Sequence, residues 1–232
     1  MTSIDSELCE EHAEGDMTVF SADVLASMPS LVTLKLSAGD GLGLSARAFN
    51  SITAALRNGA LQALQTLKFE LCMLGGDDII DFTSALETSG CAQQLMSLGF
   101  RRCQFDTERL QALMKPLGRG VFPALRELNL YRNAGITDVG VEALSDALLG
   151  ASHTYLWSLD LRNVGMGDAG MKDLAFLVHQ GRLAQLRKLL IAGNYDVIDR
   201  GIHALAGAIN DYGLSALKVF SREQRPRASG PL

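Results

Sequence analysis

The sequence contains few of the residues and patterns that mark membrane proteins and zinc proteins. It has four cysteines and one tryptophan among 232 residues, and aromatic residues make up 6% of the chain. No run of about 18 apolar residues occurs, so no membrane-spanning segment is expected. Neither Cys9 nor Cys91 has a C-x-x-C partner. The sequence therefore offers no support for a zinc site.

The histidines form no arrangement suited to catalysis or metal binding. They are His12, His153, His179 and His203. None lies four residues from another metal ligand, and none has a candidate nucleophile at a matching place in the chain. A Ser-His-Asp triad or a paired-carboxylate site therefore cannot be assembled. We expect a protein without enzymatic activity, cofactor or metal.

Basic residues are missing from the start of the chain. Residues 1–16 hold six acidic residues and no lysine or arginine, which is the wrong charge for a secretory or mitochondrial leader. The chain also lacks an N-x-S/T sequon, so we expect the protein in the cytoplasm, with the nucleus as an alternative. Because residues 1–16 lack periodicity, they are predicted to form a disordered acidic tail. Residues 222–232 are polar and are predicted to form a flexible tail.

The sequence does contain one motif that recurs along the chain, and its clearest copy is Leu125-Arg-Glu-Leu128-Asn-Leu130-Tyr-Arg-Asn133. This is the leucine-rich repeat pattern L-x-x-L-x-L-x-x-N/C-x-L, in which the apolar residues lie on a strand. The first leucines of the copies are Leu31, Leu64, Leu95, Leu125, Leu156, Leu186 and Leu217. One unit cannot bury its apolar face alone, so neighbouring units must stack into one core.

Between the predicted strands the apolar residues change to helical spacing, as in Val141, Leu144 and Leu148. Polar residues mark the predicted helix starts: Ser45, Asp77, Asp106, Thr137, Asp168 and Asp199. Their side chains are expected to accept hydrogen bonds from the first free amides of their own helices. Each repeat is thus predicted to consist of one strand and one full helix.

The chain resembles the ribonuclease-inhibitor-like class of leucine-rich repeat proteins in two respects. Each unit of about 30 residues holds a full helix, and the turn into the helix has the sequence Ile136-Thr-Asp138-Val-Gly140-Val141-Glu-Ala143-Leu144. The resemblance implies an α/β solenoid over residues 17–221, with about six to seven strand–helix repeats. It also implies a parallel sheet on the concave side, helices outside, and a binding role for the concave face.

The middle repeats carry the candidate binding residues. Motif places three, five, seven and eight point away from the core, toward the concave face. There, and at the neighbouring second place, we predict a partner-binding patch made of Arg101, Arg102, Arg126, Tyr131, Arg132, Trp157 and Arg162. Arg101, Tyr131 and Arg162 should form one row, because adjacent parallel strands lie about 4.8 Å apart. Arginine and aromatic residues are typical of interface hot spots.

Two other patterns are explained by the repeat. Gly165-Met-Gly167-Asp-Ala-Gly170 matches G-x-G-x-x-G, but its Asp and Gly align with those of neighbouring repeats and no ribose-binding acid follows about 20 residues later. Cys72 and Cys103 occupy the ninth place of neighbouring repeats, close enough for a disulfide. In a reducing compartment we expect two buried thiols instead.

The function predicted from the sequence is a non-enzymatic scaffold that binds a protein with an acidic surface through the concave face. Nucleic acid is disfavoured because aromatic residues are few and no known nucleic-acid motif is present. A first alternative is a regulator of a small GTPase, since Ran GTPase-activating proteins share this repeat class. A second is a structural protein that oligomerises through the last strand, whose edge has no predicted cover.

Overall fold

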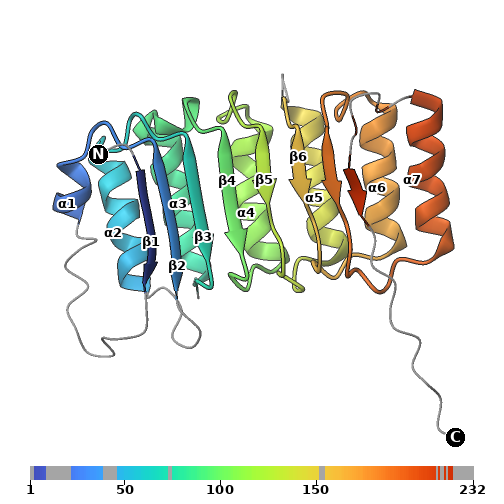
Figure 1. The fold of residues 1–232 in the computed structure, drawn as a ribbon, viewed down its shortest axis with the longest axis horizontal. Helices are drawn as coiled ribbons and strands as arrows, with labels where there is room; N and C mark the ends of the chain where they lie inside the picture. Colours follow the sequence, from blue (N-terminus) through green and yellow to red (C-terminus); the bar gives the residue numbers. More distant parts are fainter. Residues whose placement is uncertain are drawn as a thin grey trace, which may run out of the picture.

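Strands and helices alternate along the chain, and the strands lie side by side in front of the helices in Figure 1. The structure is a computed structural model. It describes residues 3–8, 22–38, 46–72, 75–151, 155–212, 214, 217 and 219–221. The predicted tail at 222–232, and residues 9–16 of the acidic leader, lie outside the described residues.

The strands form one eight-stranded parallel sheet in which the spatial order follows the chain order. The strands are β1 (Ser3–Leu8), β2 (Thr33–Ala38), β3 (Thr66–Glu70), β4 (Ser97–Arg101), β5 (Glu127–Asn129), β6 (Ser158–Asp160), β7 (Lys188–Leu190) and β8 (Val219–Ser221). Equivalent motif places lie opposite one another, as Leu98, Leu128 and Leu159 do. The predicted repeat register is therefore confirmed.

One helix follows each of the strands β2 to β7 and packs on the same face of the sheet (Figure 1). The helices are α1 (Ala22–Ala26), α2 (Ala46–Arg57), α3 (Gly76–Ser89), α4 (Thr107–Gly118), α5 (Thr137–Gly150), α6 (Asp168–His179) and α7 (Asp199–Tyr212), with a short 3₁₀ helix, η2 (Cys91–Gln93), before β4. The other face of the sheet carries no helix in the described part of the chain. The predicted α/β leucine-rich repeat solenoid is confirmed.

The core lies between the sheet and the helices, where the apolar motif places converge. In the first half it contains a chain of aromatic rings. Phe69 stacks on Phe100 with centroids 5.3 Å apart, and Phe100 contacts Phe105 at 4.6 Å. In β3 the side chains alternate between half-buried and buried, as expected for a strand with one face on the core.

Strand β1 differs from the sequence-based prediction. Residues 1–16 were expected to be disordered, but residues 3–8 pair in parallel with β2, from Ser3 opposite Thr33 to Leu8 opposite Ala38. The physical reason lies in β2, because the first strand of a repeat array presents unpaired N–H and C=O groups along its edge. Pairing with those groups outweighs the weak local preference of an acidic segment.

The ends of the strands are held by a buried asparagine in two repeats. The side chain of Asn133 is 1% exposed. Its Oδ1 accepts the N–H groups of Cys103 and Phe105 at 3.0 Å, and its Nδ2 donates to the carbonyls of Phe100 at 2.6 Å and Leu130 at 2.8 Å. Because every polar atom of the amide has a partner, the chain can turn sharply inside the core without an unsatisfied group.

The predicted start Ser45 lies outside the described residues. The helices α3 to α7 begin within one residue of their predicted starts, but not all of the capping follows the prediction. Asp106 accepts the N–H of Arg109 in its own helix at 2.9 Å, as expected. Asp138 and Asp168 instead bond to the backbone of the following repeat. Each helix amino terminus lies beside that of its neighbour in a solenoid, so a carboxylate can reach across to it. The expectation that Asp168 caps its own helix is wrong. In α5 the residue at the cap position is Ile136 and not the predicted Thr137.

Candidate functional site

The candidate site lies on the helix-free face of the sheet, which we call the open face. Its residues come from corresponding places in neighbouring repeats. Ser97, Glu127 and Ser158 lie opposite one another across β4, β5 and β6. Beyond the strands the ladder continues, since the N–H of Arg132 donates to the carbonyl of Arg162 at 2.9 Å. The backbone therefore holds the open-face side chains at the spacing of adjacent strands.

Three guanidinium groups surround one tyrosine on this face. The Cζ atoms of Arg162, Arg101 and Arg132 lie 4.5, 5.1 and 5.4 Å from the ring centroid of Tyr131. A cation over an aromatic face is attracted to it by about 0.5–1 kcal/mol at exposed sites. We call these four residues the Tyr131 cluster. Arg101, Tyr131 and Arg162 lie side by side, as the repeat register predicts.

Two of the three arginines in the Tyr131 cluster are oriented by acidic residues. Asp160, whose side chain is almost fully buried, holds Arg162 through two hydrogen bonds of 2.9 and 2.6 Å. Glu70 pairs with Arg101 at 3.0 Å. Bidentate carboxylate–guanidinium pairs fix the plane of the guanidinium group. Arg132 contacts no acidic side chain among the described residues, so its charge remains uncompensated.

A third ion pair on the open face joins β3 and β5. Glu127 accepts hydrogen bonds from Lys68 Nζ at 3.2 Å and from Ser97 Oγ at 2.9 Å. This carboxylate separates the Tyr131 cluster from the residues at the amino-terminal ends of the strands. The open face is thus a surface of alternating charge and not a continuous basic strip.

A hollow of about 290 Å³ lies at the amino-terminal ends of β5, β6 and β7. These strand ends form the upper edge of the sheet in Figure 1. It is lined by Arg126, Tyr155, Trp157, Gln185 and Arg187. Both aromatic side chains are well exposed, Tyr155 at 55% and Trp157 at 40%. We call this site the amino-edge hollow.

The predicted patch is therefore divided between two places. Arg101, Tyr131, Arg132 and Arg162 form the Tyr131 cluster, and Arg126 and Trp157 line the amino-edge hollow. Arg102 is tied to the cluster only through its backbone, whose N–H donates to the carbonyl of Tyr131 at 2.9 Å. The expectation of one contiguous patch is corrected, because places two and seven lie five residues apart, about 16 Å along a strand.

Sequence reasoning missed three residues of the hollow, Tyr155, Gln185 and Arg187. A signal for Arg187 was present, since it occupies the second motif place, as Arg126 and Trp157 do in the two preceding repeats. Tyr155 and Gln185 directly precede Leu156 and Leu186, the first leucines of their repeats. Neither position belongs to the motif, and the sequence pattern therefore says nothing about them.

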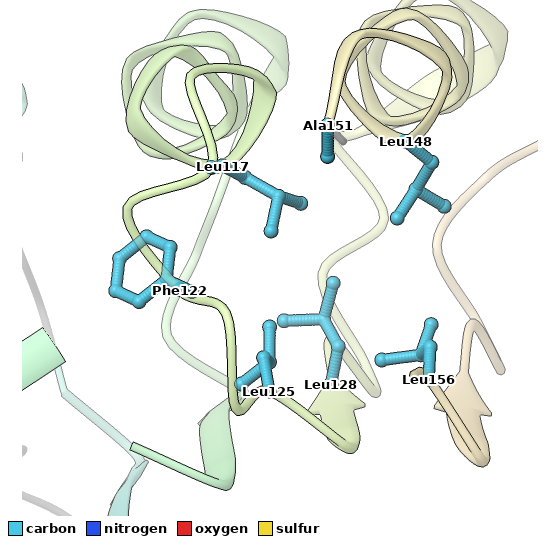
Figure 2. Close-up of a pocket in the computed structure, with 8 residues that line it drawn as sticks. Leu117, Phe122, Leu125, Leu128, Leu148, Ala151 and Leu156 are labelled. Atoms are coloured by element: carbon cyan, nitrogen blue, oxygen red, sulfur yellow. The ribbon is translucent and has the colours of Figure 1, made fainter. Parts of the chain in front are cut away.

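A small apolar cavity also lies between α4, α5 and β5 (Figure 2). Leu117, Leu128 and Leu148 point into it, and its volume is about 10 Å³. A cavity of this size holds at most one water, and only where polar partners are available. Its lining is apolar, so it is a gap in the packing and not a ligand site.

The G-x-G-x-x-G segment does not offer a free phosphate site. The N–H groups of Gly167 and Gly170, which open α6, donate to Asp138 Oδ1 at 2.7 and 2.8 Å. Phosphate-binding loops need these amides to be directed at the ligand. The amides are already bonded here, and the carboxylate would repel an anion. The repeat accounts for this segment, as expected from the sequence.

The described cysteines are buried and free: Cys72, Cys91 and Cys103. The Cys103 thiol donates to the carbonyl of Arg101 at 3.2 Å. Hydrogen bonding with Cys103, together with burial, raises the pKa of Cys72 far above its ordinary value. A thiol kept protonated is a poor nucleophile and a poor metal ligand.

The described residues offer neither a membrane span nor a metal site. There, the structure contains no helix with the length and apolar character needed to cross a membrane. Nor do three or more histidine, cysteine, aspartate or glutamate side chains gather in this part of the chain in a group able to hold a metal ion.

Comparison with known proteins agrees with the fold. A family model described as Leucine Rich repeat matches residues 123–145, which span β5 and the first part of α5. The match supports the identification of the chain as a leucine-rich repeat protein. No curated protein matches the chain.

Proposed function

We propose that this leucine-rich repeat protein is a scaffold that binds another protein through the open face of its sheet. The observation that carries the proposal is the Tyr131 cluster, in which three guanidinium groups surround one tyrosine ring. Tyrosine and arginine are enriched at interface hot spots. A tyrosine buries a large area with few rotatable bonds, and an arginine offers several hydrogen-bond donors. We assign the chain no enzymatic activity, since leucine-rich repeats are in general interaction modules.

The charge of the cluster indicates a partner with an acidic surface. Arg101 and Arg162 have acidic partners within the chain, whereas Arg102 and Arg132 have none among the described residues. A carboxylate of the partner would meet the uncompensated guanidinium group of Arg132 beside the ring of Tyr131. Complementary charge of this kind speeds association and suppresses incorrect partners.

The proposal includes membership of the ribonuclease-inhibitor-like class, with the open face as the concave side. Its support is that complete helices of 12 to 14 residues follow the strands of the middle repeats. It also includes residence in the cytoplasm or nucleus, which rests on the sequence alone. Neither the GTPase-regulator alternative nor the oligomer alternative gains an observation from the described residues.

The experiment is affinity capture from native lysate with three forms of the protein. The first is wild type, and the second carries Arg101→Glu, Arg132→Glu and Arg162→Glu. The charge-matched control carries Arg57→Glu, Lys115→Glu and Arg200→Glu, three exposed positions on the helices α2, α4 and α7. Circular dichroism on each form confirms that the fold is retained.

We expect one or more proteins to bind wild type and the control and to be lost from the open-face variant. Purified partner should then bind wild type with an affinity that falls as ionic strength rises, because the contact is between charges. If wild type and the open-face variant capture the same proteins, the Tyr131 cluster is ordinary solvated surface and the proposal is wrong.

A further inference from the structure

The amino-edge hollow is built by three neighbouring repeats in register. The N–H of Trp157 donates to the carbonyl of Arg126 at 2.8 Å, and the N–H of Arg187 donates to the carbonyl of Trp157 at 2.8 Å. The three side chains therefore follow one another at the spacing of adjacent strands, about 4.8 Å. An indole lies between two guanidinium groups in the order of the repeats.

The positive charges at the hollow are uncompensated. Among the described residues, no acidic or hydrogen-bonding partner contacts the side chains of Arg126, Arg187 or Lys188. Lys188 lies opposite Ser158 on the strand next to Trp157, so it adds a third cation at the same edge. The open-face acid Glu127, which follows Arg126 in the chain, is already engaged by Lys68 and Ser97. The hollow therefore has more unpaired charge than the Tyr131 cluster.

The hollow also exposes aromatic surface that a folded chain usually covers. Trp157 is 40% exposed and Tyr155 is 55% exposed. The volume of about 290 Å³ is at the lower end of small-molecule sites, which begin at roughly 300 Å³. Such a space suits one apolar side chain of a partner better than a cofactor. Burying it against the indole would remove apolar area of both partners from water.

We propose that the amino-edge hollow binds an acidic segment of a partner protein, in which an apolar side chain is flanked by carboxylates. The apolar side chain contacts Trp157, and the carboxylates meet Arg126 and Arg187. This inference goes beyond the proposed function, because it adds a second contact site about five residues away from the Tyr131 cluster along each strand. The two sites can be tested separately.

The charge pattern favours a polypeptide over single-stranded nucleic acid. Proteins that bind single strands combine aromatic residues with a continuous positive groove that follows the phosphates. Here Glu127 and Asp160 lie on the adjoining strands, between the hollow and the Tyr131 cluster. These carboxylates neutralise Lys68 and Arg162, so the open face offers no continuous positive groove to a regular row of phosphates. A segment with separate acidic residues needs only the charges at the hollow.

The test uses the fluorescence of Trp157, which is the only tryptophan of the chain and therefore reports on the hollow alone. The probe is a short synthetic peptide with blocked ends, in which one leucine is flanked by glutamates. Three comparison ligands are the same peptide with serine in place of leucine, the same peptide with lysines in place of the glutamates, and an oligothymidylate of equal length.

The titrations are repeated with three variants. The hollow variant carries Arg126→Glu and Arg187→Glu, with Arg126→Gln and Arg187→Gln as a milder form in case the first does not fold. The second variant is the Arg101, Arg132 and Arg162 triple substitution. The third carries Lys115→Glu and Arg200→Glu on the outer helices as the charge-matched control. Thermal unfolding followed by circular dichroism confirms that each is folded.

We expect the leucine–glutamate peptide to shift the Trp157 emission to shorter wavelength, because the indole becomes covered. The dissociation constant should rise about tenfold or more in the hollow variant, as for loss of directly contacting charges, and change little in the control and the triple variant. The serine peptide should bind more weakly, and the lysine peptide should not bind.

The inference is overturned if the leucine–glutamate peptide leaves the emission unchanged, or if the lysine peptide or the oligothymidylate binds more tightly. A peptide whose binding is lost in the triple variant and kept in the hollow variant also overturns it. That last result would support the proposed function at the Tyr131 cluster, so failure of one is distinguishable from failure of the other.

Discussion

Asp138 and Gly170 belong to successive repeats and form one structural unit. The Oδ1 atom of Asp138 accepts the N–H of Gly170 at 2.8 Å. A Cβ atom added to Gly170 would lie 2.9 Å from that same oxygen, which is too close. Asp168 and Gly201 repeat the arrangement at 3.0 Å, with a Cβ–Oδ1 distance of 2.5 Å. The recurring aspartate and glycine thus form a contact between neighbouring repeats.

Replacing Asp138 with alanine should cost about 1–2 kcal/mol of unfolding free energy, as other losses of a helix cap do. Gly170→Ala should also destabilise the protein, although alanine is the better helix former. In the Asp138→Ala background the cost of Gly170→Ala should fall, because the oxygen that it approaches is gone. Urea unfolding of both single variants and the double variant measures this coupling.

The control is Gly207→Ala in α7, where a Cβ would meet nothing within 4 Å. This change should be neutral or stabilising by up to about 1 kcal/mol. If the losses of stability from Asp138→Ala and Gly170→Ala simply add in the double variant, the two positions act independently. That result would contradict the contact between Asp138 and Gly170.

Asn133→Ala should destabilise the protein by at least about 3 kcal/mol, because each buried group left without a partner costs about 1–3 kcal/mol. The side chain makes hydrogen bonds to the backbone of Cys103, Phe105, Phe100 and Leu130. Chemical unfolding measures the loss. Asn58→Ala, an exposed position at the end of α2, should change stability by no more than about 0.5 kcal/mol. Equal effects at both positions would contradict the structural role of Asn133.

Leu159→Ala should cost about 2–5 kcal/mol, as truncation of a buried leucine does. Leu159 is fully buried and lies opposite Leu128, whose truncation should have a similar effect. Ser158→Ala changes the neighbouring residue, which is only half-buried, and should cost far less. A loss below about 1 kcal/mol for either leucine would mean that the strand register is wrong.

Asp173→Asn should raise stability at neutral pH. Burial, followed by the charges of Glu142, Asp138 and Asp146, raises the pKa of Asp173 above its ordinary value of 3.8. The folded state therefore binds a proton more readily than the unfolded state, so the stability of wild type falls as the pH rises from 3.8 through the raised pKa. The asparagine variant lacks this penalty.

The gain from Asp173→Asn should be below about 0.5 kcal/mol, since the group is partly exposed. It should disappear below pH 3.8, where the carboxyl is protonated in both states. Unfolding in urea at several pH values measures the difference. Asp196→Asn, at an exposed loop position, is the control. A gain that does not depend on pH would contradict the role assigned to the charge of Asp173.

The sequence alone was sufficient to predict the repeat register, the parallel order of the strands and the starts of the middle helices. These features depend on local patterns, because the apolar residues of each unit, such as Leu128 in β5, have one face to bury and only neighbouring units to bury it against. The adjacency of Arg101, Tyr131 and Arg162 followed from the same register.

Only the tertiary structure showed which atoms meet between repeats. The pairing of β1 with β2, the reach of Asp138 to the next helix and the hollow shared by Arg126, Trp157 and Arg187 all join separate repeats. The physical reason is that a repeat pattern specifies the direction and depth of a side chain. Which group that side chain contacts in the next repeat depends on its length, its charge and the free backbone groups nearby. These groups become neighbours only when the repeats stack.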